Sequence, residues 1–185
     1  MSSPNDFLKE LMRLKSLPRT GWLLRGVRDV ESIADHSFGV AFIAMLLADR
    51  ASAKGLEVNT EIVLRMALLH DIAEVRTGDL PSTVKPYFPG KALAEANDKA
   101  ANDVLHGLGD AAVYYKAIRE QYETRESLEA RIVKAADKLD LLFQAREYQS
   151  GGATNLEEFF ENAAEDFTLL GLDGLIADIL TSLET

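Results

Sequence analysis

Apolar residues recur with the period of an α-helix along almost the whole chain. No stretch shows the alternation of a half-buried strand, and neither an internal repeat nor a linker divides the sequence. The predicted helices cover about residues 5–15, 32–53, 60–74, 91–107, 110–122, 126–149, 155–170 and 173–184. We therefore predict an all-α fold in which one helical bundle spans residues 1–185.

Local chemistry marks the ends of several of these helices. Asn5 or Asp6 is a suitable cap for the first helix. Ser32 begins the second helix, and Asp35 three positions later resembles the second half of a capping box. Gly55 ends that helix.

Two connections are longer than tight turns. Residues 17–30 contain Pro18, Gly21 and Gly26 and are predicted to form a structured, non-helical connection. Residues 76–90 contain three prolines and two glycines, which predicts a long ordered loop. Loops of this length in a compact domain often carry function, so the loop over 76–90 is a candidate part of a site.

Composition narrows the class of protein. Of the 185 residues, 47% are hydrophobic and 27% are charged, which is typical of a globular domain. The absence of cysteine excludes a disulfide framework and a thiolate metal site, and it agrees with a reducing compartment such as the cytoplasm. The sequence shows neither a charged-then-apolar leader nor an apolar run long enough to cross a bilayer. We therefore expect no secretory signal and no membrane partner.

The formal net charge of −10 changes the expected partners. Nonspecific binding of polymeric nucleic acid or of anionic membranes needs a basic surface, so an acidic chain is a poor match for both. A small anionic substrate bound in a local basic pocket remains compatible with this charge.

Imidazole and carboxylate side chains interrupt three of the apolar helices. His36 lies near the start of the second helix, and His70 and Asp71 lie near the end of the third. Asp137 lies in the middle of the helix over residues 126–149. One such histidine is usually a hydrogen-bonded core residue, and one such aspartate usually faces solvent. Buried carboxylates without partners cost several kcal/mol, so the coincidence favours a shared cation. Two imidazoles and two carboxylates suit one divalent ion such as Co, Mn, Ni, Fe or Zn.

A further carboxylate, Glu74, follows His70 by four residues. On a continuous helix it would lie on the same side, one turn on. Four protein ligands on an ion that accepts six leave positions for water and for a substrate oxygen. Glu74 is therefore the candidate general acid/base that moves the proton of the attacking water.

The order of these ligands, His36, His70-Asp71 and Asp137, resembles the H…HD…D signature of HD-domain phosphohydrolases. Over about residues 5–150 the surrounding sequence resembles the 5′-deoxynucleotidase group of that family. The stretches that carry this resemblance are PRTGWLLRGV, ESIADHSFGVAFIAMLLA, ALLHDIAEVRTGDLPSTVKPYF and ARIVKAADKLDLLFQAREY.

The resemblance implies a single HD domain, with a motif-bearing core over about residues 5–150 and further helices over about 155–185. It implies one divalent metal ion held by the four ligands, with Glu74 as the catalytic acid/base. The implied reaction is hydrolysis of nucleoside 5′-monophosphates, with a preference for deoxyribose, to nucleoside and phosphate. The implied assembly is a cytoplasmic homodimer.

The resemblance also implies where the substrate is bound. Trp22 would flank the nucleotide, since an indole face is a platform on which any base can stack. The alternative is an ordinary core aromatic. The residues expected to contact the sugar are Asp79, Leu80, Pro81 and Ser82.

One position departs from the bacterial members of the group. There a basic residue directly precedes the tryptophan and orients the phosphate, whereas this chain has Gly21. Arg19 is the candidate replacement, Arg25 and Arg28 are alternatives, and Lys85 is a weaker one. A guanidinium suits a phosphate dianion because it donates two parallel hydrogen bonds.

Two alternative functions remain open. Another HD phosphohydrolase, such as a phosphodiesterase or an alarmone pyrophosphohydrolase, is the nearest, although only His106 remains as a further histidine for a second metal ion. A non-catalytic nucleotide or metal sensor is the other, although metal binding alone does not require Glu74. Asp140, one turn after Asp137, is interpreted as a surface acid or as an acid that supports the ligands from behind, and it could orient Lys138.

Overall fold

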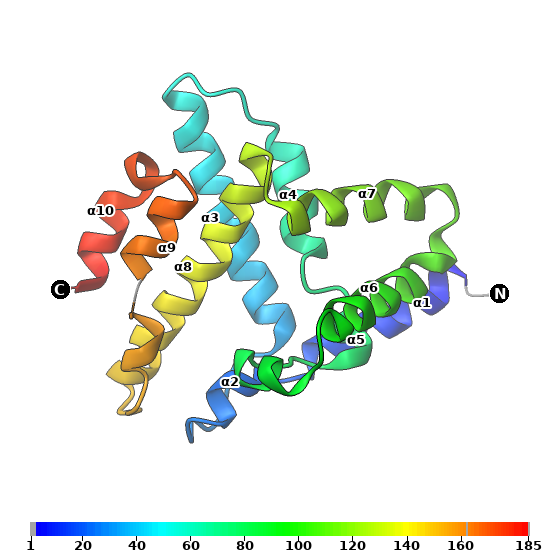
Figure 1. The fold of residues 1–185 in the computed structure, drawn as a ribbon, viewed down its shortest axis with the longest axis horizontal. Coiled ribbons are helices and arrows are strands. Elements are labelled where there is room, and N and C mark those ends of the chain that lie inside the picture. Colours follow the sequence, from blue (N-terminus) through cyan, green and yellow to red (C-terminus); the bar gives the residue numbers. More distant parts are fainter. Residues whose placement is uncertain (1–2, 162, 185) are drawn as a thin grey trace.

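The computed structural model describes residues 3–161 and 163–184, and these residues are mainly helical (Figure 1). The longer helices are α1 (Pro4–Leu11), α3 (Ile33–Ala53), α4 (Thr60–Leu69), α6 (Ala92–Leu105), α7 (Asp110–Thr124), α8 (Leu128–Ser150), α9 (Ala163–Leu169) and α10 (Asp173–Glu184). The short elements are α2 (Thr20–Leu23), α5 (Glu74–Thr77) and the 3₁₀ turns η1 (Met12–Lys15), η2 (Ser82–Tyr87), η3 (His106–Leu108) and η4 (Glu157–Phe159). Within this described part, the extended pairing is one isolated bridge between Pro18 and Ser32. The predicted all-α fold is confirmed.

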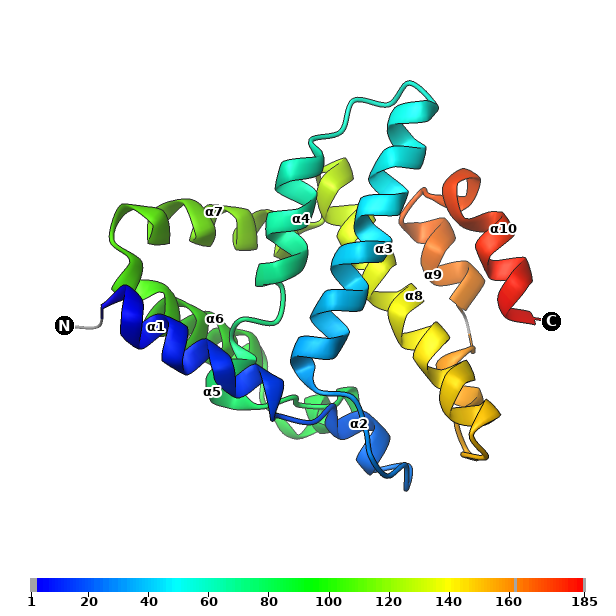
Figure 2. The same cartoon turned by 180° about the vertical axis from the view of Figure 1, so that it is seen from behind.

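The two longest helices, α3 and α8, cross at the centre of the molecule, and α4 packs against both of them (Figures 1 and 2). Both contribute fully buried alanines to the core, Ala44 and Ala48 from α3 and Ala135 and Ala136 from α8. Small side chains allow two helix axes to approach closely. The crossing therefore holds the first turn of α3 beside the middle of α8, where two of the predicted metal ligands lie.

The capping box predicted for the second helix is confirmed. The Ser32 side chain accepts a hydrogen bond from the Asp35 backbone N–H, and the Asp35 side chain accepts one from the Ser32 backbone N–H. The cap predicted for the first helix is wrong by two or three residues. Ser3 is the cap, and Asp6 is its capping-box partner, because Pro4 is suited to the first helical position.

The helix predicted over residues 60–74 is interrupted. α4 ends at Leu69, a turn carries His70 to Ala73, and α5 begins at Glu74. In a continuous helix the backbone N–H of Asp71 would donate to the carbonyl of Ala67. That carbonyl instead lies 2.7 Å from His70 Nδ1. The His70 side chain therefore competes with the backbone and helps to end the helix.

The two connections are more ordered than predicted. The expected non-helical connection over residues 17–30 contains α2, and the expected loop over residues 76–90 contains η2. Asp79 Oδ2 accepts a hydrogen bond from the backbone N–H of Thr20 at 2.5 Å. Asp79, in the connection over residues 76–90, therefore fixes the first residue of α2 in the other connection.

The C-terminal helices pack on the same domain (Figure 1). Phe167 and Ile176 are fully buried in the main core, and Arg50 of α3 forms an ion pair of 2.7 Å with Asp178 of α10. The structure thus extends the helical bundle beyond the motif-bearing core. In the predicted range 1–185, residues 1, 2, 162 and 185 lie outside the described part.

Among the helices in residues 3–161 and 163–184, none is both long enough and apolar enough to cross a bilayer.

Replacing Ser32 by alanine tests the capping box at the start of α3. We expect the Ser32→Ala variant to lose about 1 kcal/mol of the free energy of unfolding, since the N–H groups of the first turn lose their acceptor. Urea denaturation followed by circular dichroism measures the change. Ser52→Ala, an exposed site in the same helix, is the control and should change stability by less than about 0.5 kcal/mol. Equal losses in both variants would contradict a role for the cap.

Candidate metal centre and substrate cavity

The first candidate ligand, His36, lies in the first turn of α3 and is fully buried. Its Nδ1 atom lies 2.7 Å from Asp140 Oδ2 of α8. Because a carboxylate only accepts hydrogen bonds, Nδ1 carries the proton and Nε2 faces away from Asp140. This contact agrees with the interpretation of Asp140 as an acid that supports the ligands from behind. The suggested contact with Lys138 is wrong, since Lys138 pairs with Asp166 at 3.1 Å.

The second candidate ligand, His70, has the same orientation. Its Nδ1 atom lies 2.7 Å from the backbone carbonyl of Ala67, which can only accept a hydrogen bond. Its Nε2 atom therefore presents a lone pair, and it lies 3.4 Å from Nε2 of His36. Both imidazoles are held by one nitrogen and have the other free for a ligand bond, which is the usual arrangement of metal-binding histidines.

Three of the four predicted ligands bring their donor atoms together, and the fourth, Asp137, lies beside them next to His36. His70 Nε2 lies 3.1 Å from Asp71 Oδ2, and His36 Nε2 lies 3.3 Å from Asp137 Oδ1 and 3.7 Å from Asp71 Oδ2. An ion with bonds of about 2.0–2.2 Å to nitrogen and oxygen separates neighbouring donors by roughly 2.8–3.6 Å. His36, His70 and Asp71 form a compact group, with ligand atoms all within 4.8 Å of one another. The spacing therefore fits a divalent ion.

Two unsatisfied oxygen atoms support this fit. Asp71 Oδ2 and Glu74 Oε2 are inaccessible to solvent and have no hydrogen-bond partner among the described residues. Asp71 Oδ2 also faces the lone pair of His70 Nε2, and two such atoms repel unless a proton or a cation lies between them. A buried acceptor without a partner is costly, so both atoms indicate a missing partner at this site, which for Asp71 Oδ2 fits a cation.

Both ligand carboxylates are ionised. Burial alone would raise the pKa of Asp71, but the neighbouring imidazoles and the Arg19 guanidinium outweigh it and hold that pKa well below its ordinary value. Burial acts in the same way on Asp137, where Lys134 and His36 keep the pKa well below its ordinary value. Two ionised carboxylates supply the negative charge that stabilises a divalent cation.

Glu74 has the opposite electrostatic environment. It is the first residue of α5, just beyond the His70-Asp71 turn. Burial, followed by the negative charges of Asp71 and Asp79, raises the pKa of Glu74 to about 9. A carboxyl group that holds its proton near neutral pH, next to carboxylates that do not, is suited to proton transfer.

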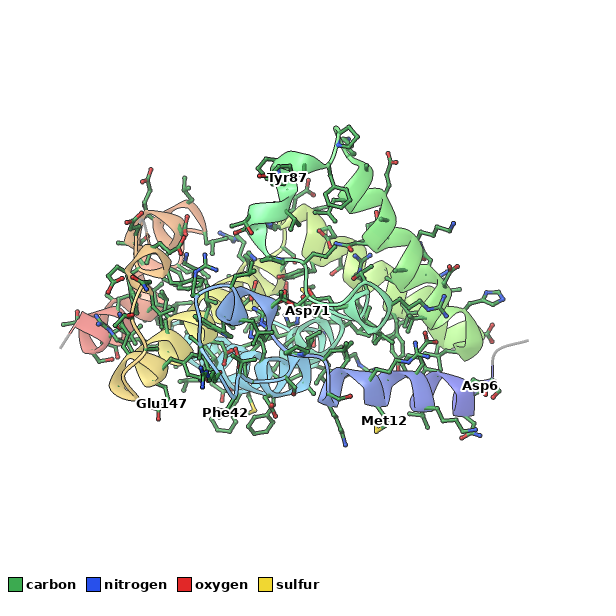
Figure 3. All side chains as sticks on the ribbon, turned by 90° about the horizontal axis from the view of Figure 1, so that it is seen from below. Asp6, Met12, Phe42, Asp71, Tyr87 and Glu147 are labelled. Carbon is green, nitrogen blue, oxygen red and sulfur yellow. The ribbon has the colours of Figure 1, made fainter. Side chains whose placement is uncertain are left out.

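Asp71, Asp137 and Glu74 line a cavity of roughly 280 Å³, whereas His36 and His70 are not part of its lining. Asp71 lies in the interior of the molecule, whereas Tyr87 of η2 lies at its edge (Figure 3). All the predicted substrate contacts line this cavity, namely Arg19, Trp22, Asp79, Leu80, Pro81 and Ser82. The lining also includes Gly21, Arg25, Lys85, Lys134, Leu141 and Phe159.

Trp22 lies in the wall of this cavity but is not an open platform. Its side chain is 1% exposed because α2 turns it inward, against Tyr148 and Phe159. Its Nε1 atom donates a hydrogen bond of 2.9 Å to Glu31 Oε1. The open indole expected from a non-helical connection is therefore replaced by a buried one, and Phe159 and Leu141 contribute apolar surface to the cavity.

The arginines proposed to replace a basic residue at position 21 differ in position. Arg19 reaches the metal ligands, with NH1 at 3.6 Å from Asp71 Oδ2 and 3.5 Å from Asp79 Oδ1. Arg25 lines the cavity but pairs with Glu158 at 2.6 Å. Arg28 is exposed and does not line the cavity.

Comparison with known families assigns the chain. A model of the HD domain matches residues 11–168. The chain belongs to the HD domain family. It is an HD-family phosphohydrolase, and the match extends from the last residue of α1 into α9.

Relatives of this HD-domain chain agree with that assignment. It is 33% identical over 171 residues to the 5′-deoxynucleotidase HDDC2 of Danio rerio, covering 90% of this chain and 81% of the relative. A conserved hypothetical protein from Pyrococcus furiosus has a similar structure, with a TM-score of 0.85, 40% identity and coverage of 97% and 98%. A predicted metal-dependent phosphohydrolase from Magnetospirillum magnetotacticum has a TM-score of 0.65, 29% identity and coverage of 95% and 90%.

The sequence analysis of this HD-domain chain missed two positions beside the metal centre. A Cβ atom at Gly39 would lie only 1.9 Å from Asp140 Oδ1, so only glycine leaves room for that carboxylate to approach His36. Lys134 donates a hydrogen bond of 2.7 Å to Asp137 Oδ2. The signal for both was helical spacing, since Gly39 and Lys134 each lie three residues from a predicted ligand.

Replacing Gly39 by alanine tests the Asp140–His36 contact. We expect Gly39→Ala to weaken the affinity for Mn²⁺ or Co²⁺ by about 10- to 100-fold, because the displaced Asp140 no longer fixes the His36 ring. Isothermal titration calorimetry on protein stripped with chelator measures this affinity.

A double variant is the control for this prediction. Once Asp140→Ala has removed the carboxylate, adding Gly39→Ala should cause little further loss of affinity, because the clash no longer exists. Additive losses in the double variant would show that alanine at position 39 acts by another route and would contradict the prediction.

Proposed function

We propose that this chain hydrolyses nucleoside 5′-monophosphates, with a preference for deoxyribose, to nucleoside and phosphate. The observation that carries the proposal is a single cavity lined by Asp71, Asp137, the proton-holding Glu74 and Arg19. His36 and His70 lie behind it, with Nε2 atoms 3.1–3.7 Å from the two aspartates. Relatives named 5′-deoxynucleotidase, at about 30% identity over most of this chain, support the substrate class.

The metal ion that His36, His70, Asp71 and Asp137 would hold supplies an activated water and polarises the phosphoryl oxygen. Co, Mn, Ni, Fe or Zn would each suit this set of nitrogen and oxygen donors. One ion is proposed, since the remaining histidine, His106, is exposed on η3 and does not line the cavity.

Glu74 would move the proton. It would deliver the proton that it holds to the 5′ oxygen of the leaving nucleoside and regain one from the attacking water. Its place at the start of α5, beside the ligand turn and on the cavity, supports this assignment.

The other end of the cavity would hold the nucleoside. Asp79, Leu80, Pro81 and Ser82 would contact the sugar, and a wall fitted to one 3′-hydroxyl would favour deoxyribose. Trp22 would support the nucleotide from within the wall. A cavity of roughly 280 Å³ is at the small end of ligand sites, which supports a mononucleotide as substrate.

A substrate panel tests the proposed reaction. We expect phosphate release from deoxyribonucleoside 5′-monophosphates, loss of this activity with chelator, and its return when Mn, Co, Ni, Fe or Zn is added. Ribonucleotides should react more slowly, and di- and triphosphates should not react. Activity confined to cyclic nucleotides, diesters or alarmones would identify another HD phosphohydrolase instead.

Glu74→Gln separates an enzyme from a sensor. We expect kcat to fall by about 10²- to 10⁴-fold, because the amide cannot exchange the proton, while metal binding is retained. Glu147→Gln, an exposed site on α8 away from Asp71 in Figure 3, is the control and should keep full turnover. A wild-type protein that binds nucleotide without releasing phosphate would contradict the catalytic proposal.

A cytoplasmic location and a homodimer also remain proposals. An apolar face supports the homodimer: Phe38, Phe42 and Leu68 are 72%, 59% and 60% exposed beside a groove of roughly 450 Å³. Phe42 and Met12 project from this side of the molecule (Figure 3). The groove lining contains Lys15 and Arg65 but no carboxylate. Because the whole chain has a net charge of −10, two copies repel each other electrostatically, and this face without carboxylates repels a second copy least.

Replacing Phe38 by glutamate tests this interface. We expect the wild-type chain to be a dimer in light scattering and Phe38→Glu to be a monomer with unchanged helicity, because removing an ionised side chain from water into an apolar interface is costly. Leu169→Glu, which replaces a side chain 78% exposed on α9, is the control and should remain dimeric. A monomeric wild type at micromolar concentration would contradict the proposal.

A further inference from the structure

Four cations line the cavity, and the structure distinguishes them by what they contact. The Arg25 guanidinium donates hydrogen bonds to Glu158 at 2.6 Å and to the carbonyl of Gly21 at 2.8 Å, and it lies 4.5 Å above the ring of Phe159. These three contacts hold Arg25 in the wall. The Arg25 guanidinium therefore stabilises the wall of the cavity and is less available to bind a phosphate inside it.

Two of the other cations are less suited to a phosphate at the metal centre. Arg19 lies between the carboxylates of Asp71 and Asp79, at 3.6 Å and 3.5 Å, which offset its charge. Lys85 is exposed on η2, at the outer edge of the cavity.

Lys134 is the cation that lies beside the ligand atoms. It precedes Asp137 by three residues on α8, and its Nζ atom lies 2.7 Å from Asp137 Oδ2. The other oxygen of Asp137 lies 3.3 Å from His36 Nε2, on the side where the ligands converge. A single carboxylate therefore separates the ammonium group from the metal position.

The remaining donors of Lys134 are free for a ligand. An ammonium group has three N–H donors, and among the described residues Asp137 is the hydrogen-bond partner of this one. The side chain is 33% exposed, and it lines the cavity. An oxygen atom of a phosphate group beside Asp137 would therefore lie within reach of a Lys134 N–H.

We propose that Lys134 binds the phosphate group of the substrate and supplies the positive charge that Gly21 does not. This inference rests on the proposed function, because it assumes a phosphomonoester in the cavity. The competing explanation is that Lys134 only offsets the charge of Asp137. The two explanations differ in what the loss of the ammonium group weakens, phosphate binding or metal binding.

The test replaces Lys134 by methionine, which keeps the length of the side chain and removes the charge. The probe is inorganic phosphate, titrated by calorimetry into the Mn²⁺-loaded protein and used as a competitive inhibitor. We expect Lys134→Met to raise both the Kd for phosphate and the KM for deoxynucleoside monophosphate by about 10- to 100-fold. The Kd for Mn²⁺, measured separately, should change by less than about threefold.

Lys138→Met is the matched control. Lys138 lies one turn further along α8, does not line the cavity and pairs with Asp166. We expect its replacement to leave phosphate and metal affinities unchanged. If Lys134→Met does not fold, Lys134→Gln, which keeps a donor for Asp137, takes its place with the same expected loss of phosphate affinity.

Two results would overturn the inference. The first is unchanged phosphate affinity in Lys134→Met or Lys134→Gln. The second is a loss of Mn²⁺ affinity with normal phosphate affinity at saturating Mn²⁺, which would mean that Lys134 only offsets Asp137. In both cases the wild-type protein would still release phosphate. Failure of the proposed function is distinct, because the wild type itself would then hydrolyse no phosphomonoester.

Discussion

The close packing of four polar ligand groups in the interior is the constraint on which this structure depends. Two imidazole nitrogens and two ionised carboxylates lie 3.1–3.7 Å from their neighbours. Hydrophobic burial does not stabilise a cluster of polar atoms, so contacts with the surrounding residues must hold these side chains in place. The α3–α8 crossing provides His36 and Asp137, the interrupted helix between α4 and α5 provides His70 and Asp71, and the remaining polar contacts fix each side chain in its orientation.

The interruption after Leu69 is central to this arrangement. Adjacent residues on a helix point about 100° apart, so His70 and Asp71 could not easily share one ion on a continuous α-helix. In the turn, His70 Nε2 and Asp71 Oδ2 lie 3.1 Å apart. The same turn directs Glu74 into the cavity, where burial and neighbouring carboxylates raise its pKa to about 9. The local loss of helical structure thus sets both the spacing of the candidate ligands and the position of Glu74.

Sequence predicted the helices and the set of candidate ligands, because both follow from local periodicity and from polar residues at apolar positions. It did not predict contacts between distant segments. The break at His70 depends on a side chain that competes for one carbonyl, and the burial of Trp22 depends on Tyr148 and Phe159, more than a hundred residues away. The role of Asp140 depends on a missing Cβ atom on another helix, at Gly39. Helical spacing alone carries none of this information.

The position of Phe159 has a consequence for how this family can diversify. It belongs to η4, after the last metal ligand in the chain, yet it lines the cavity and contacts both Trp22 and Arg25. The hydrolytic centre and this part of the cavity wall are thus encoded by separate stretches of sequence. Drift in the C-terminal stretch can reshape the pocket while the candidate ion site stays intact, so evolution can change which molecules fit the cavity without rebuilding that site.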